Sequence, residues 1–288
     1  TTFPFVHVEN LQCKEPRWVL YYYLQENSLN LIFGDPKCGK SFLALDLACC
    51  VATGKDFHGL PVDYGSVAYI AGEGLNGLIR RKKAWSLAND VQVVDYLYMS
   101  ERSASLTDSD SVSKIVSSLD ELHNYKPLKL VVIDTLARNF GDGDENSTKD
   151  MNRFIQSVDY IRERYECAML IVHHTGTANK ERERGAFALR GAIDTGYKIE
   201  KDSNFNQIKM KPVITRDTKP PESKVYKLLK TDLNFLDSQG QQVTSAVLCL
   251  TNNVFNPQAT KNKDSWLDLA WKELIELLGD SPDQGVSE

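Results

Sequence analysis

The stretch GDPKCGKSF, residues 34–42, has the residue types and spacing of a phosphate-binding loop. Gly34 and Gly39 let backbone N–H groups converge on phosphate oxygens, and the helix expected to follow points its positive N-terminus at the same place. Lys40 would reach the outer phosphates, and the Ser41 hydroxyl would ligate Mg²⁺. The alternative is a glycine-rich turn that only joins a strand to a helix. We predict that the nucleotide is contacted by Gly34, Asp35, Pro36, Lys37, Cys38, Gly39, Lys40, Ser41 and Phe42.

Two acidic residues follow apolar runs that we expect to be strands. Asp134 ends KLVVID, residues 129–134, where its carboxylate could accept from Ser41 or from a Mg²⁺-bound water. Its alternative role is a helix N-cap. Glu73 lies near the end of GSVAYIAGEG, residues 65–74, between two glycines that let the backbone approach a ligand. Glu73 could orient the attacking water as a general base, and its alternative is a solvated turn residue.

A pair of histidines ends the run AMLIVHH, residues 168–174. A neutral imidazole at a strand end can donate a hydrogen bond to a γ-phosphate. Because successive strand residues point to opposite faces, only one of the two is expected to do so. We assign this contact to His174 and a packing role to His173.

The elements that must position these residues follow from the hydrophobic pattern. Short apolar runs alternate with amphipathic stretches, which predicts an α/β fold with a mainly parallel sheet and helices on both faces. Beyond Gly191 the alternation of polar and apolar residues predicts an antiparallel C-terminal extension of that sheet. The predicted strands are 30–35, 65–71, 95–99, 129–134 and 167–174, and the predicted helices are 40–53, 77–88, 111–123 and 148–166.

Composition shifts divide the chain into four parts. We predict an N-terminal lead-in at 1–29, an ATPase-type core at 30–251, a linker at 252–263, and an amphipathic helix with a disordered tail at 264–288. Because the sequence begins with Thr1, we expect a domain of a longer protein.

Bulk properties narrow the class of protein. The net charge of −5 gives no overall electrostatic footprint for nucleic acid, so any such contact must be local. The six cysteines form no CxxC pair, which disfavours a zinc or dithiol site and indicates a reduced, cytoplasmic protein. No apolar run reaches the roughly 18 residues of a membrane span, so no membrane partner is expected.

Several segments together resemble the RecA-type ATPases of the RepA-like and DnaB-like replicative helicases, especially those of phages and mobile elements. The resemblance covers roughly residues 14–250 and rests on GDPKCGKSFLALDLA, GSVAYIAGEG, LVVIDTLARNFGDGDENSTKDMNRFIQSVD, MLIVHHTG and RGAFALRGAIDTGYKI. It implies a RecA-like core, ATP with Mg²⁺, a hexameric ring that translocates on single-stranded DNA, and a primase or other replication proteins as partners.

By motif position, the same resemblance assigns roles to individual residues. Lys40 and Ser41 match the phosphate-loop pair, and Asp134 matches the Mg²⁺ acid. Glu73 matches the catalytic glutamate, and His174 matches the γ-phosphate sensor.

The family also places a basic strand tip in the neighbouring subunit's ATP site. The corresponding segment here is VITRDTKPP, so Arg216 is the expected trans-acting residue, with Arg190 as runner-up and Lys219 in reserve. The family pattern RGSSALR appears as RGAFALR, in which Ala186 and Phe187 replace two hydroxyl residues.

Two loops could face the central channel of the ring that the resemblance implies. The segment 139–150 is acidic and would repel phosphate, so an allosteric or interface role is expected there. The segment 175–191 is basic, and its Lys180, Arg182 and Arg184 are the candidate DNA contacts, although interleaved acids also suit a salt-bridged surface helix.

The basic run GLIRRKKAW, residues 77–85, is interpreted as a solvated helix face, because a helix spreads consecutive residues around its circumference. The functional alternatives to a helicase motor are a regulatory or loader ATPase without strand-separating activity, and a protein that binds nucleotide only for structure.

Overall fold

The apolar runs form one mixed sheet flanked by two helical layers. The computed structural model describes residues 5–13, 15–176, 187–202 and 206–251. The elements in chain order are η1 (Val8–Asn10), β1 (Trp18–Leu20), β2 (Leu24–Gln25), β3 (Leu29–Gly34), α1 (Lys40–Thr53), β4 (Ser66–Ala71), α2 (Leu75–Asn89), β5 (Leu97–Met99), α3 (Ser109–Tyr125), β6 (Leu128–Asp134), α4 (Leu136–Asn139), α5 (Thr148–Tyr165), β7 (Ala168–His174), α6 (Phe187–Ala192), β8 (Thr195–Asp202), β9 (Gln207–Thr215), β10 (Lys224–Leu236) and β11 (Gln242–Thr251).

Within the described residues the main sheet has nine strands, in the order β11-β10-β9-β8-β3-β7-β6-β4-β5. The strands from β8 to β5 are parallel to one another, and β9, β10 and β11 continue the sheet in antiparallel fashion. This is the predicted fold class.

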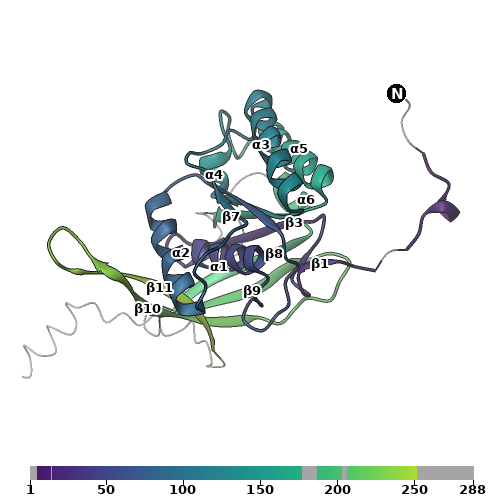
Figure 1. The fold of residues 1–288 in the computed structure, drawn as a ribbon. Coiled ribbons are helices and arrows are strands. Elements are labelled where there is room, and N and C mark those ends of the chain that lie inside the picture. The colour runs from purple at the N-terminus through teal and green to yellow at the C-terminus, as the bar shows by residue number, and fades with distance from the viewer. Residues whose placement is uncertain (1–4, 14, 177–186, 203–205, 252–288) are drawn as a thin grey trace, which may run out of the picture.

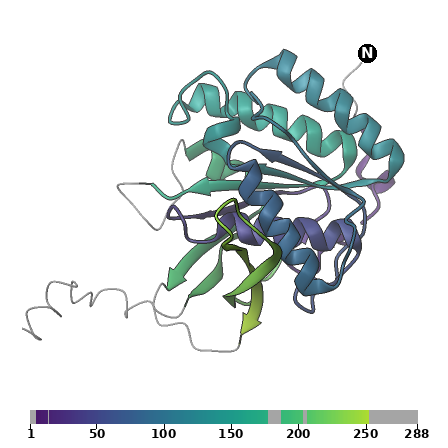
Figure 2. The ribbon, with the colours of Figure 1, turned by 60° about the vertical axis from the view of Figure 1, so that its left-hand side comes forward.

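Alternate residues along each central strand pack into different cores, as a sheet covered on both faces requires. On β6, Leu130 and Val132 pack with α1 and α2, whereas Val131 and Ile133 pack with α3, α4, α5 and α6. Figures 1 and 2 show the two helical layers on opposite faces of the sheet. The two layers bury the strands almost completely, which fixes the positions of the strand ends.

The C-terminal strands β10 and β11 form a long hairpin that extends beyond the body of the sheet (Figure 1). A register shift between Asp232 and Leu236 bends the hairpin, and Asn234 adopts a left-handed conformation there, with φ at 59°. The hairpin packs against α2, where the Lys83 ammonium lies 4.5 Å from the centroid of the Phe235 ring.

The predicted strands and helices of the core are present, with bounds that differ by a few residues. One expectation was wrong in part: the segment beginning at Asp194 does not start the antiparallel extension, because β8 pairs parallel with β3 and only β9 reverses direction. The predicted linker at 252–263 and helix at 264–288 lie outside the described residues. Among the helices that the structure describes, none is long and apolar enough to cross a membrane.

Candidate active site

Four neighbouring strands end at one edge of the sheet, and each end carries a predicted functional residue. The register pairs Gly34 of β3 with His174 of β7, Val172 of β7 with Asp134 of β6, and Asp134 with Ala71 of β4. Neighbouring strands lie about 4.8 Å apart. The phosphate loop after β3, His174, Asp134 and the turn with Glu73 after β4 therefore form one row.

The glycines of the phosphate loop are required by close packing. A Cβ on Gly34 would lie 2.3 Å from the Ile199 carbonyl oxygen of β8, and Gly39 has a φ of 103° at the N-cap of α1. Larger residues would push the loop away from β8 or strain its last turn. Gly54 ends α1 in a left-handed C-cap whose N–H donates to the Cys50 carbonyl.

The Lys40 ammonium lies inside the loop. Its Nζ donates to the carbonyl oxygens of Gly34 and Asp35, both at 2.9 Å, and lies 3.5 Å from Nδ1 of His174. Burial lowers the pKa of Lys40, while Cys38 and Asp134 act in the opposite direction. Lys40 is therefore a buried positive charge at the strand end that also carries His174.

Asp134 is held by a buried tyrosine. Tyr69 of β4 donates its hydroxyl to Oδ2 of Asp134 at 2.6 Å, and burial raises the pKa of Tyr69 well above its ordinary value, with Asp134 adding to the rise. Tyr69 thus remains a protonated donor at neutral pH. The N-cap of α4 is Thr135, so the helix-cap alternative for Asp134 is wrong.

A cavity of about 300 Å³ opens beside this row of strand ends. It is lined by Ser41, Glu73, Gly74, Leu78, Arg81 and Asp134. The Ser41 hydroxyl and the Asp134 carboxylate are the hard oxygen ligands that Mg²⁺ prefers. Among the described residues, no three His, Cys, Asp or Glu side chains cluster as a complete metal site. The oxygen chemistry of Ser41 and Asp134 fits a Mg²⁺ ion, which would take its other ligands from water and phosphate.

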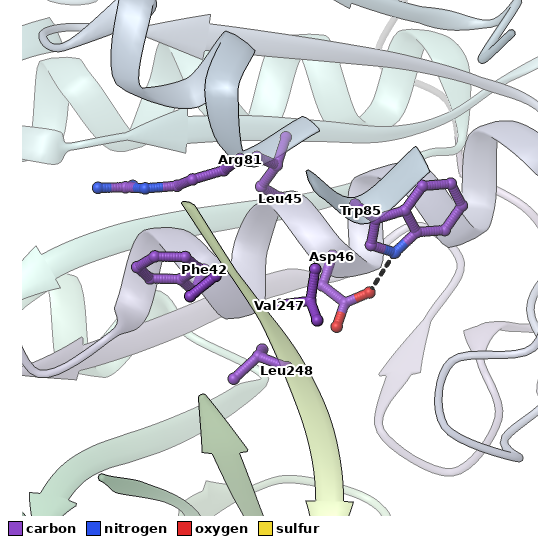
Figure 3. A pocket seen from close by; sticks show the side chains of 8 residues that line it. Phe42, Leu45, Asp46, Arg81, Trp85, Val247 and Leu248 are labelled. Atoms are coloured by element: carbon purple, nitrogen blue, oxygen red, sulfur yellow. Dashed lines mark hydrogen bonds between the residues drawn. The ribbon is translucent and has the colours of Figure 1, made fainter. Parts of the chain in front are cut away.

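Arg81 is less exposed than expected from the interpretation of residues 77–85 as a solvated helix face. Leu78, Arg81 and Trp85 are spaced three and four residues apart, which places them on the inner side of α2. The Arg81 guanidinium lies 4.4 Å from the centroid of the Phe42 ring, and Figure 3 shows the two side chains beside each other. A second, small pocket there, of about 10 Å³, is lined in part by Asp46, which accepts from Nε1 of Trp85 at 2.6 Å.

The two histidines lie on opposite faces of the sheet. His174 faces the phosphate loop, whereas His173 is fully buried on the other side, with Nε2 at 4.0 Å from Oε2 of Glu145. Glu145 belongs to the acidic segment 139–150, whose remaining acids are more exposed. The segment thus contacts the strand that carries His174.

The predicted trans-acting residues lie away from this site. Arg216 follows β9 at the opposite edge of the sheet, where its backbone N–H donates to Asp194 and its guanidinium to the Gly191 carbonyl. Arg190 is half-buried on α6. The candidate DNA contacts Lys180, Arg182 and Arg184 lie outside the described residues.

Three side chains at the site escaped the sequence analysis: Tyr69, Arg81 and Arg138. Strand alternation could have revealed Tyr69, because it lies four residues before Glu73, and helical spacing from Leu78 could have revealed Arg81. Nothing in the sequence indicates Arg138, which donates from Nε to Oε2 of Glu73 at 3.0 Å.

The sheet order is that of a RecA-like α/β fold, with a P-loop sequence at the carboxyl end of β3. Residues 2–180 match a family described as AAA domain, and the chain belongs to this family. A crystal structure of the RadB recombinase is similar in fold, with a TM-score of 0.53 over 72% of this chain and 89% of that chain, at 13% sequence identity. No curated protein matches the chain in sequence.

Proposed function

We propose that this chain is the Mg²⁺-dependent ATPase motor of a ring-forming replicative DNA helicase, hexameric and active on single-stranded DNA. The observation that carries the ATPase part is the row formed by the phosphate loop, His174, Asp134 and Glu73 at one sheet edge. The helicase part is supported by the motif resemblance, and a cytoplasmic setting with a primase or other replication proteins as partners follows from it.

Each residue has a distinct task in hydrolysis. The backbone of the phosphate loop and Lys40 hold the phosphates, and Ser41 and Asp134 would hold Mg²⁺, which neutralises phosphate charge when bound. Glu73 orients the attacking water and accepts its proton. His174, 3.5 Å from Lys40, contacts the γ-phosphate and responds to its loss.

The position of Arg216 supports a shared site. The strand β3 has six residues. At about 3.3 Å per residue, its ends are roughly 17 Å apart. Arg216 lies at the end of the sheet opposite the phosphate loop, so it is poorly placed to reach its own site. In a ring it would serve a neighbour, where an arginine stabilises charge in the transition state. Arg190 is the second candidate for this role.

A second function, a regulatory or loader ATPase that separates no strands, is favoured by one observation. The segment between α4 and α5 exposes Asp142 and Asp144 and would repel a DNA backbone. The net charge of −5 acts in the same direction.

The test is ATP turnover measured across protein concentration, with and without single-stranded DNA, together with displacement of a labelled strand. We expect turnover to rise with concentration and with DNA, and Lys40→Ala or Glu73→Gln to lower kcat by about 100-fold or more. Unchanged turnover in either variant would contradict the ATPase assignment. Turnover that neither responds to DNA nor separates strands would favour the loader.

A further inference from the structure

The carboxylate of Glu73 is held by one arginine. Arg138 of α4 donates from Nε to Oε2 of Glu73 at 3.0 Å. Within the described part of the chain, Arg138 is the only side chain that hydrogen-bonds or ion-pairs with Glu73. The contact engages Oε2, so it leaves Oε1 able to accept a hydrogen bond from water.

The position of Arg138 is set by tight packing of α4 on the end of β4. A Cβ on Gly72 would lie 2.3 Å from Cβ of Arg138, so α4 approaches this closely only because residue 72 is glycine. Gly72 also donates its N–H to the Asp134 carbonyl oxygen at 2.7 Å. The turn with Glu73 and the helix with Arg138 are therefore fixed to each other through backbone contacts.

A buried asparagine completes this connection. Asn139, fully buried, donates from Nδ2 to the carbonyl oxygens of Ile70 and Thr135 and accepts from the Ala104 N–H at Oδ1. It thus joins the end of β4 to the start of α4. Arg138 precedes Asn139, so its backbone is held by the same contacts, and its side chain extends toward Glu73.

An ion pair in this position contributes little to stability. The side chains of Arg138 and Glu73 are 62% and 53% exposed, and exposed pairs are largely screened by water. The ion pair affects the orientation of the Glu73 side chain more than it affects stability, because Glu73 has three rotatable side-chain bonds and follows a glycine. Without a partner it would sample many directions, and a misplaced general base loses most of its effect.

From this geometry we infer that Arg138 is a positioning residue that orients Glu73 toward the attacking water. The inference rests on the proposed ATPase function. It assigns to α4 a task in hydrolysis besides covering the sheet: the helix that follows Asp134 sets the direction of the glutamate on the neighbouring strand. An opposite role, in which Arg138 withholds Glu73 from the water, gives the opposite kinetic result.

The experiment compares steady-state ATP hydrolysis by the intact chain carrying Arg138→Ala, Arg138→Lys, Glu73→Gln, or Arg138→Ala with Glu73→Gln. We expect Arg138→Ala to lower kcat about tenfold with KM for ATP unchanged, as for an interaction made in the transition state. Arg138→Lys should recover part of the loss, because lysine keeps the charge but not the planar geometry. In the Glu73→Gln background, Arg138→Ala should change kcat less than twofold, since the pair acts as a unit.

The matched control is Arg153→Ala. Arg153 is 54% exposed and pairs with Asp150 at 3.5 Å on α5, so it tests the loss of a comparable surface arginine. Its kcat should equal that of the wild type, and thermal melting should show all variants folded.

Three outcomes overturn the inference. An Arg138→Ala kcat at or above that of the wild type excludes positioning, and an increase indicates withholding. An equal loss in both backgrounds shows that Arg138 acts independently of Glu73. Normal turnover by the Glu73→Gln protein would contradict the proposed catalytic role of Glu73 itself. This result distinguishes a failure of the proposed function from a failure of the role assigned to Arg138.

Discussion

At the scale of single residues, the environment of Asp134 decides how it can hold a metal ion. One carboxylate oxygen accepts from Tyr69, which is buried and stays protonated. The hydrogen bond from Tyr69 fixes the orientation of the Asp134 carboxylate and leaves the other carboxylate oxygen for a metal ion or its water. Residues that hydrogen-bond to metal ligands commonly act in this way. Tyr69 is therefore expected to matter for Mg²⁺ binding through its hydrogen bond to Asp134.

Replacing Tyr69 with phenylalanine should raise the Mg²⁺ concentration for half-maximal ATP hydrolysis by about 10-fold or more, because loss of an outer partner typically weakens metal affinity 10–100-fold. It should also lower the free energy of unfolding by about 1–3 kcal/mol, since Oδ2 of Asp134 loses its buried donor. A Mg²⁺ titration of turnover and denaturant unfolding measure the two effects.

Tyr197→Phe is the matched control for this substitution. Tyr197 is as buried as Tyr69, both 1% exposed, and donates at 2.6 Å to the Tyr23 carbonyl, away from the cavity. It should lose stability without changing the Mg²⁺ dependence. A Tyr69→Phe protein with the same Mg²⁺ dependence as this control would show that the hydrogen bond does not orient Asp134.

The residues that could be predicted from sequence share one property: they end apolar runs. Asp134 and His174 end their strands as predicted, and Glu73 lies in the turn after β4; all three come together because the carboxyl ends of parallel strands meet at one edge. The contacts of Tyr69 with Asp134 and of Arg138 with Glu73 could not be predicted, since each joins residues 65 positions apart. Such pairs depend on strand order and on the packing of α4, which local periodicity does not contain.

At the scale of elements, the four-residue helix α4 is the clearest example of packing that the sequence pattern hides. It is too short to show helical periodicity, yet its close approach to Gly72 aligns the ends of β4 and β6. The antiparallel extension of the sheet likewise shows what the sequence pattern cannot predict. Alternation predicted the strands after Gly191, but the parallel pairing of β8 with β3 arises from a long-range contact.

The packing of α4 predicts that Gly72→Ala and Gly77→Ala will have opposite effects. At residue 72 the new methyl group would lie 2.3 Å from Cβ of Arg138, and forcing α4 away should cost about 1–3 kcal/mol of stability. Residue 77 lies in α2 with nothing within 4 Å of the added Cβ. There, alanine should stabilise by roughly 0.5–1 kcal/mol, because it favours helix over glycine.

Urea unfolding measures both changes, and ATP turnover adds a functional readout. Gly72→Ala should lower kcat together with stability, since Glu73 and Arg138 move apart, whereas Gly77→Ala should leave kcat unaltered. If Gly72→Ala were as stable and as active as the wild type, α4 would have to adjust without loss, and the rigid link between α4 and β4 would be disproved.

At the scale of the whole molecule, the sheet separates the two sets of residues that the proposed shared site requires. The phosphate loop, His174 and Asp134 lie at the carboxyl ends of the parallel strands, and Arg216 lies at the other edge beside the start of β8. A single chain therefore carries both halves of the proposed site without bringing them together. The strand order that creates this separation could not be predicted from periodicity, which contains no information on which strands pair.

The separation predicts complementation between two inactive proteins. Glu73→Gln removes the water-orienting half of a site but keeps Arg216, and Arg216→Ala does the reverse. Each alone should have a kcat at least about 100-fold below the wild type. Mixed in equal amounts, they should regain activity, because about a quarter of the interfaces in a randomly assembled ring would join an intact phosphate loop to an intact Arg216.

The control mixture is Glu73→Gln with Lys40→Ala. Both proteins keep Arg216 and lack a working phosphate half, so no arrangement of their subunits restores a site. Turnover is measured after exchange, with sedimentation to show that mixed oligomers form. Activity in the first mixture but not in the second requires the site to lie between subunits. Mixed oligomers that remain inactive in both cases would exclude Arg216 as the shared residue and direct the same experiment to Arg190, whose side chain is half-buried on α6.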